Sequence, residues 1–474
     1  MSAWPSIAVI AEDVRSGKTK AGDLVGRALK AIDDQAKYKA IVATTAERAK
    51  HRATEIDDQV AKGQNPGRLA GVPFIAKDNF LAFGANTTAA SNILKGFDAP
   101  YQATAIERLE AEGAICVAKA NLDAFAHGSS TENSDFFTTH NPVDMERVPG
   151  GSSGGSATAV MLDMAPFALG TDTGGSIRLP AAFTGAVGYK PTYGLVSRSG
   201  VIAMASSTDV IGPITKTVED SALVLDVMAG KDELDSTTID RDEKAYTELA
   251  IDLKGKKIGL IREYMGDGLE AGVKKQIEEA IEKLKKAGAD IMEVSLPSLP
   301  LALAVYYIVC PAEVSSNLSR YDGQRYGYSF GQAKDLEDSY EQSRSRGFGN
   351  EAKRRIMIGT YVLSSGYYDA YYKRAQIVRT KLANEFKQAF MDVDFLLGPT
   401  APSVAFKIGE HAHDPLQMYL TDIMTVAVNL VGVPAISIPA GESQGLPVGL
   451  QLVAPQHHDR ILLAAAKQTE EILA

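Results

Sequence analysis

From Lys39 onward, apolar segments of strand length alternate with amphipathic segments of helix length. The runs KAIVATT, VPFIAKDNF and ICVAKAN have strand character, and the segments between them, AERAKHRATEIDDQVAKG and ATAIERLEAEGA, have helical character. Farther along the chain, KKIGLIREY, GVKKQIEEAIEKLKKAGAD and IMEVSLP repeat the order strand, helix, strand. Strands separated by helices of this length predict βαβ units and a largely parallel sheet with helices on both faces. The predicted fold class is therefore α/β.

Length alone would suggest about three domains for a chain of 474 residues. Between residues 301 and 380 the sequence is rich in Tyr, Ser, Arg and helix formers, after which FLLGPTAP, PAISIPAG and LPVGLQLVAP restore strand character. No Pro/Gly/Ser-rich linker bounds this section, so we expect a single domain over 1–474 with a helical excursion at about 301–380. The opening segment is the only low-complexity candidate, and we expect no apolar run of membrane-spanning length.

The charge balance limits which partners this chain can bind. It carries 49 basic and 59 acidic residues, a formal net charge of −10, and the lysines of 274–286 alternate with glutamates. Such a surface repels a phosphate backbone, so any nucleic acid is expected to be held by a partner. Cys116 and Cys310 lie in apolar runs, which excludes a disulfide framework and gives no metal-ligand spacing. The opening residues do not resemble a leader, and we expect a cytoplasmic location.

The segment PGGSSGGSATAV, residues 149–160, could be a flexible linker or a tight turn that enters a helix. A linker should be flanked by polar sequence, yet this segment continues into the apolar run ATAVMLDMAPFALG. A second glycine-serine turn, GTDTGGSIRLPAA, follows directly. The pattern therefore predicts two turns on either side of a buried helix and strand, with their tips together at one end of a sheet.

Gly150, Ser152 and Gly154 also match the short G-x-S-x-G pattern of a nucleophile elbow, which needs a histidine base. The histidines far enough downstream stand in polar loops without an evident acid partner; they are His411, His413, His457 and His458. The sequence therefore favours serine chemistry with a base other than histidine.

Lys77 is the lone cation in the apolar strand segment GVPFIAKDNF. Burial disfavours an ammonium ion, so a lysine there could serve as a neutral base. Its pKa would have to fall from about 10.4 to about 7, which corresponds to roughly 4 kcal/mol. For an isolated lysine, an ion pair with Asp78 or a side chain that extends to solvent would be the better interpretation.

Three separated motifs, namely Lys77, GGSSGGSA at 150–157 and GTDTGGSIRLPAA at 170–182, resemble the amidase signature family. The resemblance implies a large mixed sheet flanked by helices and a Ser-cisSer-Lys triad. In this sequence Ser176 would be the nucleophile, Ser152 the relay serine preceded by a cis peptide bond, and Lys77 the base. Ser153 is expected to be a turn serine that bonds the backbone.

The same resemblance gives the loop before the nucleophile a role. Glycines let the backbone approach a substrate closely, so the amides of Thr173, Gly174, Gly175 and Ser176 are expected to form an oxyanion hole. Attack by Ser176 on an amide would release ammonia and leave an acyl ester for water to hydrolyse. Asp172 and Arg178 are expected to brace the loop as an ion pair.

Longer stretches, among them NLDAFAHGSSTENSDF and KRRIMIGTYVLSSGYYDAYYKRAQIVRT, resemble one branch of that family, the A subunits of tRNA-dependent amidotransferases. The resemblance implies a glutaminase that works with subunits B and C, passing ammonia to the B partner, with the C partner as a small clamp. The B partner would use ATP and Mg²⁺ to convert Glu-tRNA(Gln), and possibly Asp-tRNA(Asn), to the amidated forms. No cofactor or metal is expected in this chain itself.

Glutamine is a zwitterion, so its pocket needs a cation and an anion. The family pattern places Arg355 on the carboxylate and Asp422 on the ammonium, with Tyr307 alongside; Arg354 cannot face the pocket together with Arg355. His127 stands where this branch more often has methionine, and we interpret it as local packing. Two other hypotheses stay open, a stand-alone amidase of another small amide and a non-catalytic scaffold.

Overall fold

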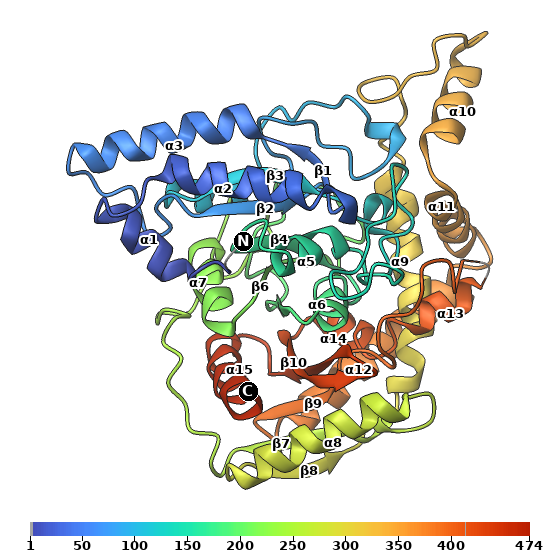
Figure 1. The fold of residues 1–474 in the computed structure, drawn as a ribbon. Coiled ribbons are helices and arrows are strands. Elements are labelled where there is room, and N and C mark those ends of the chain that lie inside the picture. The colour runs from blue at the N-terminus through green and yellow to red at the C-terminus, as the bar shows by residue number, and fades with distance from the viewer. Residues whose placement is uncertain (1–2, 413) are drawn as a thin grey trace.

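The structure is a computed structural model that describes residues 3–412 and 414–474. Eleven strands form one sheet in the order β1-β3-β2-β4-β6-β5-β10-β11-β9-β7-β8 (Figure 1). Their bounds are β1 Ile41–Thr44, β2 Pro73–Lys77, β3 Ile115–Ala120, β4 Phe167–Asp172, β5 Val187–Lys190, β6 Val210–Thr215, β7 Lys257–Ile261, β8 Asp290–Val294, β9 Phe395–Pro399, β10 Ala435–Ser443 and β11 Leu446–Val453.

The sheet is mixed, which confirms the architecture implied by the family resemblance. Parallel pairing occurs near the two ends, where β2 pairs with β3 and β4, and β7 pairs with β8 and β9. The centre is antiparallel, from β4 through β6, β5, β10 and β11 to β9. The expectation of a largely parallel sheet is wrong here because β5 and β6, and β10 and β11, are joined without a crossover helix.

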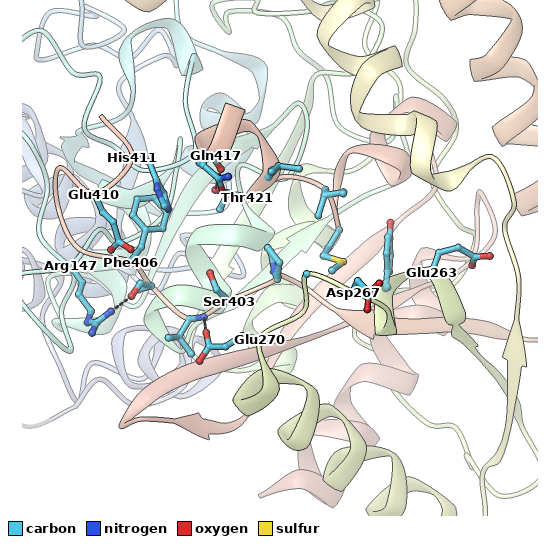
Figure 2. A pocket seen from close by; sticks show the side chains of 18 of the residues that line it. Arg147, Glu263, Asp267, Glu270, Ser403, Phe406, Glu410, His411, Gln417 and Thr421 are labelled. Carbon is cyan, nitrogen blue, oxygen red and sulfur yellow. Dashed lines mark hydrogen bonds between the residues drawn. The ribbon is translucent and has the colours of Figure 1, made fainter. Parts of the chain in front are cut away.

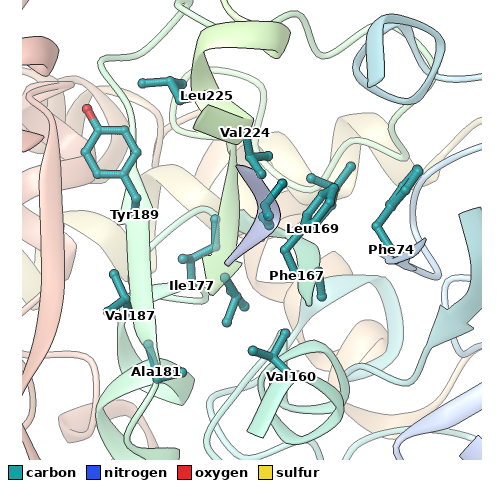
Figure 3. Close-up of a cluster of buried hydrophobic side chains, with 14 of the residues drawn as sticks. Phe74, Val160, Phe167, Leu169, Ile177, Ala181, Val187, Tyr189, Val224 and Leu225 are labelled. Atoms are coloured by element: carbon teal, nitrogen blue, oxygen red, sulfur yellow. The ribbon is translucent and has the colours of Figure 1, made fainter. Parts of the chain in front are cut away.

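The helices bury the sheet from both sides. Their bounds are α1 Ile7–Arg15, α2 Ala21–Asp34, α3 Ala46–Ala61, α4 Thr104–Ala111, α5 Gly154–Met161, α6 Arg178–Thr184, α7 Val218–Met228, α8 Ala271–Lys286, α9 Ala302–Leu318, α10 Leu336–Gly347, α11 Asn350–Leu363, α12 Arg374–Ala389, α13 Pro415–Leu420, α14 Val426–Val431 and α15 Asp459–Leu473. Figure 3 shows Val224 and Leu225 of α7 on one side of the strands, and Val160 of α5 and Ala181 of α6 on the other. Phe74 of β2 and Phe167 of β4 stack between them, with ring centroids 5.3 Å apart.

The opening segment, the only low-complexity candidate, forms two ordered helices. Helices α1 and α2 are amphipathic, and the apolar face of α1 buries Ile7, Ile10 and Val14 in the main core. The Ile7 amide donates to Asp220 Oδ1 at 2.9 Å, and Trp4 Nε1 donates to the Asp163 carbonyl at 2.8 Å. These contacts fix the segment to the body of the molecule.

Helices α9 to α12 occupy the stretch between the two groups of strands. The helical segment Leu299–Leu318 has 20 residues and a mean hydropathy of 1.4, so it is long and apolar enough to cross a membrane, contrary to the expectation from the sequence. Half of it is buried in this fold, where α9 packs against α11, α12 and α14. A Cβ at Gly359 of α11 would overlap the Pro311 carbonyl of α9, so glycine permits this close helix packing.

Candidate active site

The two glycine-serine turns meet, as the sequence predicts. The first enters α5, β4 follows that helix, and the second turn leads from β4 into α6. The Ser153 amide donates to the Ser176 carbonyl at 3.1 Å, which ties the turns together. Lys77 is the last residue of β2, and β2 pairs directly with β4. The lysine therefore reaches the same end of the sheet as both turns.

The Lys77 ammonium group lies in a closed nest of hydroxyl groups. Lys77 Nζ lies 2.8 Å from Ser152 Oγ, 2.9 Å from Ser153 Oγ and 2.9 Å from Thr171 Oγ1. The alternative ion pair with Asp78 does not form, since Asp78 pairs with Lys119 at 2.8 Å. These neutral hydroxyl groups form hydrogen bonds with the amine, but they stabilise its charged form less than a carboxylate in contact would.

Burial therefore dominates the protonation of Lys77. It lowers the pKa of this lysine to about 7, against the opposing attraction of the more distant Asp123, Asp172 and Asp209. A substantial fraction of Lys77 is then neutral near pH 7, and a neutral amine accepts a proton from a hydroxyl.

Ser152 and Ser176 differ in exposure. Ser152 is fully buried and follows a cis peptide bond from Gly151, whereas Ser176 retains 8% of its exposure. Ser152 Oγ contacts Lys77, but the described residues show no hydrogen bond that joins Ser152 Oγ to Ser176 Oγ. The structure thus places Lys77 beside Ser152 and leaves the Ser176 hydroxyl unengaged by other described side chains.

The loop that carries Ser176 is braced by Asp172 and Arg178, both fully buried. Their side chains form two contacts of 3.0 Å, and Arg178 also reaches Asn429 Oδ1 at 2.6 Å. Burial would raise the pKa of Asp172, but Arg178 holds it at about 2. The carboxylate therefore stays ionised and accepts the amide of Ile177 at 3.1 Å.

Of the four amides predicted to form an oxyanion hole, one is occupied. The Gly175 amide donates to Asp172 Oδ1 at 2.8 Å. In the described part of the chain, the amides of Thr173, Gly174 and Ser176 donate no hydrogen bond. Gly175 has φ +136°, and a Cβ there would overlap the Thr425 side chain, so only glycine fits the turn.

A cavity of about 310 Å³ is lined by Ser129, Arg355 and Tyr419 among others. Ser176 and Asp422 do not belong to its lining, but Ser129 connects it to Asp422. Asp422, 8% exposed, accepts from Ser129 Oγ at 2.7 Å and from the Tyr307 hydroxyl at 3.2 Å. Burial raises the pKa of Asp422 to about 7, although both hydroxyls and Arg355 favour the ionised form.

Arg355 is held at the cavity by α11. Its Nε donates to Glu351 Oε1 at 2.9 Å, and its guanidinium lies 5.3 Å from the centre of the Tyr307 ring. Tyr419 stacks on Tyr307 with ring centroids 3.9 Å apart. Arg355 is 3% exposed, whereas the Arg354 side chain is 43% exposed. Both arginines nevertheless line the cavity and pair with Glu351, so the expectation that they cannot both face the pocket is wrong, because a long side chain can reach the cavity from the neighbouring helix position.

His127 is fully buried, and neither ring nitrogen has a hydrogen-bond partner in the described chain. Burial, reinforced by the charge of Arg355, lowers the pKa of His127 well below its usual value. The ring is therefore neutral, and its centroid lies 6.2 Å from that of Phe125. Packing accounts for its position, but its two nitrogens remain unsatisfied.

Sequence reasoning missed several residues that hold the site. Thr171 contacts Lys77, Ser129 contacts Asp422, and Glu351 contacts Arg355. Ser153 contacts Lys77 as well as the Thr171 carbonyl, so it does more than bond the backbone. A threonine inside the apolar strand FALGTD is a signal that could have identified Thr171.

The histidine-based alternative finds no support in the described residues. His411 packs on Phe406 with ring centroids 4.4 Å apart, and the backbone of His457 donates to Thr192. His458 Nδ1 contacts the Gln456 carbonyl, and His413 lies outside the described residues. No group of three His, Cys, Asp or Glu residues in the described chain could hold a metal ion.

Known proteins that share the sequence pattern of this site belong to the amidase family. The sequence model of the amidase family matches residues 23–463. The chain is 52% identical over 451 residues to the A subunit of the glutamyl-tRNA(Gln) amidotransferase of Geobacillus thermodenitrificans, a match that covers 95% of this chain and 93% of that one.

Solved structures share the fold. The A subunit of the glutamyl-tRNA(Gln) amidotransferase from Thermotoga maritima matches with a TM-score of 0.79 and 40% identity, over 96% of this chain and 92% of that one. A bacterial aryl acylamidase matches with a TM-score of 0.87 and 26% identity, over 99% and 96% of the two chains. With its lysine, its paired glycine-serine turns and these matches over nearly its full length, the chain belongs to the amidase family.

Proposed function

We propose that this chain is the glutaminase subunit of a tRNA-dependent amidotransferase, with Ser176 as nucleophile, Ser152 as relay and Lys77 as base. The observation that carries the proposal is the contact of Lys77 with Ser152 in a buried nest, directly behind the loop of Ser176. The similarity to amidotransferase A subunits over nearly the whole chain supports glutamine as the amide.

The proposed reaction begins with neutral Lys77. Lys77 accepts the proton of Ser152, and Ser152 accepts that of Ser176 as Ser176 Oγ attacks the amide carbonyl. The proton then returns along the same route to the departing nitrogen, which leaves as ammonia. Water hydrolyses the acyl ester on Ser176 and releases glutamate. Bound substrate would bring Ser176 Oγ within hydrogen-bond distance of Ser152.

The negative oxygen of the tetrahedral intermediate needs donors at fixed positions. The free amides of Thr173, Gly174 and Ser176 supply them, and one such donor lowers the reaction barrier by about 3 kcal/mol. The Gly175 amide joins them only if it leaves Asp172 Oδ1, so we assign it the smallest share.

The zwitterionic substrate is bound by opposite charges. Arg355 binds the glutamine carboxylate in the fork of its guanidinium, and Asp422 binds the ammonium group. Tyr307 supports both, because it contacts Asp422 through its hydroxyl and Arg355 through its ring. A neutral amide without these charges would lack both anchors.

The ammonia would serve a partner. Of subunits B and C, the first would hold the misacylated tRNA and use ATP and Mg²⁺ to convert Glu-tRNA(Gln), and possibly Asp-tRNA(Asn), while the second clamps the assembly. The names of the relatives and the net charge of −10, which disfavours direct tRNA contact, support this division. We expect this heterotrimer in the cytoplasm.

A second function, that of a stand-alone amidase, follows from the structural likeness to the aryl acylamidase. Ammonia release from glutamine distinguishes the two. The purified chain is assayed alone and with subunits B and C, as wild type and as Ser176→Ala. Release that requires Ser176 and rises with the partners is the expected result. Hydrolysis of simple amides but not of glutamine, with no response to partners, would establish the stand-alone amidase.

A further inference from the structure

The hydrogen bonds of Arg355 determine how its guanidinium can hold a carboxylate. Its Nε donates to Glu351 Oε1 at 2.9 Å. In the described chain Nη2 donates no hydrogen bond, and Nη1 has only the Cys310 sulfur as a partner, at 3.9 Å. The fork formed by Nη1 and Nη2 is therefore left for the substrate, because Glu351 already occupies Nε.

Glu351 is itself held from two further directions. Arg354, the neighbour of Arg355 on α11, pairs with Glu351 Oε2 through its Nη1. The Tyr419 hydroxyl donates to Glu351 Oε1 at 3.0 Å, the same oxygen that accepts from Arg355. Two arginines and one glutamate keep one net positive charge, so Arg354 offsets the charge of Glu351 and leaves that of Arg355 for a substrate carboxylate.

Tyr419 also connects Glu351 to the proposed anchor for the ammonium group. Its ring stacks on that of Tyr307 with centroids 3.9 Å apart, and the Tyr307 hydroxyl donates to Asp422 Oδ2 at 3.2 Å. No ion pair joins Arg355 to Asp422 in the described chain. Both charges therefore stay available to a substrate that carries the opposite charges.

Tyr419 belongs to α13, a short helix that borders two cavities. Gln417 and the adjoining Thr421 line a cavity of about 720 Å³, and Figure 2 shows both. Met418 and Tyr419 line the proposed substrate cavity. No side chain of α13 is fully buried. Since a short helix depends on tertiary contacts for its stability, the bond from Tyr419 to Glu351 is an important tie between α13 and α11.

We infer that Glu351 and Tyr419 are positioning residues for glutamine, an inference that rests on the proposed function. Glu351 fixes the direction of the Arg355 fork, and Tyr419 fixes Glu351 relative to Asp422. The carboxylate and ammonium groups of an α-amino acid are bonded to the same carbon, so their two anchors need a fixed separation. The substrate class that fits is an amide whose other end is a free α-amino acid.

A purely electrostatic role for Glu351 predicts the opposite effect on KM. Removal of a negative charge beside Arg355 would strengthen its attraction for a carboxylate, and the KM for glutamine would fall. A positioning role predicts a rise in KM, because the guanidinium loses the bond that orients it. The sign of the change in KM therefore distinguishes the two roles.

Glutamine hydrolysis is measured in the complex with subunits B and C. We expect Glu351→Ala to raise the KM for glutamine at least about tenfold and to leave kcat within about twofold, as for the loss of a charge-assisted hydrogen bond in substrate binding. Glu351→Gln keeps an oxygen that accepts from Arg355 Nε and should recover most of the loss. Tyr419→Phe keeps the ring stack but loses the hydroxyl, so the KM should rise about threefold. Glu12→Ala breaks an exposed Glu–Arg pair on α1 and serves as the control, with no change expected.

Two competitive inhibitors separate the anchors. Glutaramate lacks the ammonium group of glutamine, and 4-aminobutanamide lacks the carboxylate. Glu351→Ala should raise the inhibition constant of glutaramate as much as the KM for glutamine, and should leave that of 4-aminobutanamide unchanged. Equal losses for both inhibitors would mean that Glu351 maintains the whole cavity, which would overturn its role in orienting Arg355.

The KM of Glu351→Ala/Tyr419→Phe should equal that of Glu351→Ala, because Tyr419 acts through Glu351. Multiplied losses would refute this connection. A KM that falls or stays unchanged in Glu351→Ala would refute the inference, and so would a Glu351→Gln variant that is as impaired as Glu351→Ala. A wild-type complex that hydrolyses no glutamine would refute the proposed function and the inference with it, so the two failures give different results.

Discussion

Lys77, the proposed base, and Asp422, the proposed ammonium anchor, are both buried, and both have pKa values of about 7. Burial destabilises the charged form of each, so it lowers the pKa of the lysine and raises that of the carboxylate. The proposed reaction needs both without their proton, Lys77 as a neutral base and Asp422 as an anion. Their effects on activity therefore have the same sign.

We expect kcat/KM for glutamine to increase with pH and to level off above about pH 7. Below pH 7, two groups must each lose a proton, so the logarithm of kcat/KM should approach a slope of 2 against pH. In Asp422→Asn only Lys77 titrates, and the slope should approach 1. Rates measured between pH 5.5 and 8 test this, and a slope of 1 in both proteins would contradict the role of one group.

Loss of the Asp422 charge should act on substrate binding. A buried charge that loses its partner costs about 2–5 kcal/mol, so Asp422→Asn should raise the KM for glutamine about 30-fold or more. Propionamide lacks the ammonium and carboxylate groups and serves as the control substrate. Its hydrolysis should change little, and an equal loss for both substrates would show that Asp422 maintains the fold rather than the specificity.

At this scale the sequence predicted the residues that motifs mark and missed those that only contact reveals. Lys77 stood out as a cation in an apolar strand, and the family pattern chose Arg355 over Arg354. Ser129 is far in sequence from Asp422, and nothing local connects them. The occupied Gly175 amide was also invisible, since a sequence does not show where a backbone N–H points.

At the scale of elements, the β4–α6 turn is held by one buried ion pair. Arg178 reaches Asp172, Asn429 and Gln451, so it joins the turn to α14 and β11. The structure confirms the expected pairing of Asp172 with Arg178. It also shows that this pair, unlike a surface pair, is entirely removed from water.

Replacement of Arg178 should therefore be costly. In Arg178→Met the Asp172 carboxylate would remain buried without its charge partner, and we expect the free energy of unfolding to fall by about 3–5 kcal/mol. Urea titration measures this. Lys275→Met breaks an exposed pair with Glu279 and should cost less than about 1 kcal/mol. Similar losses in the two variants would exclude a bracing role for Arg178.

The sequence predicted those helices and strands whose apolar residues recur with a clear period. The flanks of the sheet alternate strand and helix, and their strands and helices lie where the pattern predicts them. The central antiparallel strands β5 and β6 escaped notice because an irregular loop, and not a helix, joins them, so the alternation of strand and helix is lost there. Helices α1 and α2 were missed because a mixed opening segment hides two amphipathic faces.

At the scale of the whole molecule, the proposed site draws on distant parts of the chain. Lys77 comes from β2, Ser176 from the β4–α6 turn and Arg355 from α11, and one sheet unites the strands (Figure 1). We propose that residues 1–474 fold as a single domain. The only tryptophan in the sequence, Trp4, lies close to the N-terminus, and the Arg27 guanidinium lies 3.6 Å from the centre of its ring.

Trp4 fluorescence and far-UV circular dichroism should then report the same unfolding transition. Different probes coincide when a chain unfolds cooperatively. We expect equal midpoints in urea for both signals and for loss of glutamine hydrolysis. A Trp4 transition at clearly lower urea would instead mean that the N-terminal helices unfold as a separate unit.

Asp422 and Thr425 share one short segment, and the Thr425 hydroxyl lies 2.6 Å from the Gly174 carbonyl and 3.0 Å from the Asp422 carbonyl. A mutation that shifts one of these residues shifts the other, so the proposed ammonium anchor and the proposed nucleophile loop cannot diverge independently. Within the described chain Arg355 has no such bond to the loop, and its partners Glu351 and Tyr419 stand apart from it. Over evolution, a new amide substrate would therefore be acquired through α11, which carries the proposed carboxylate-binding residue Arg355.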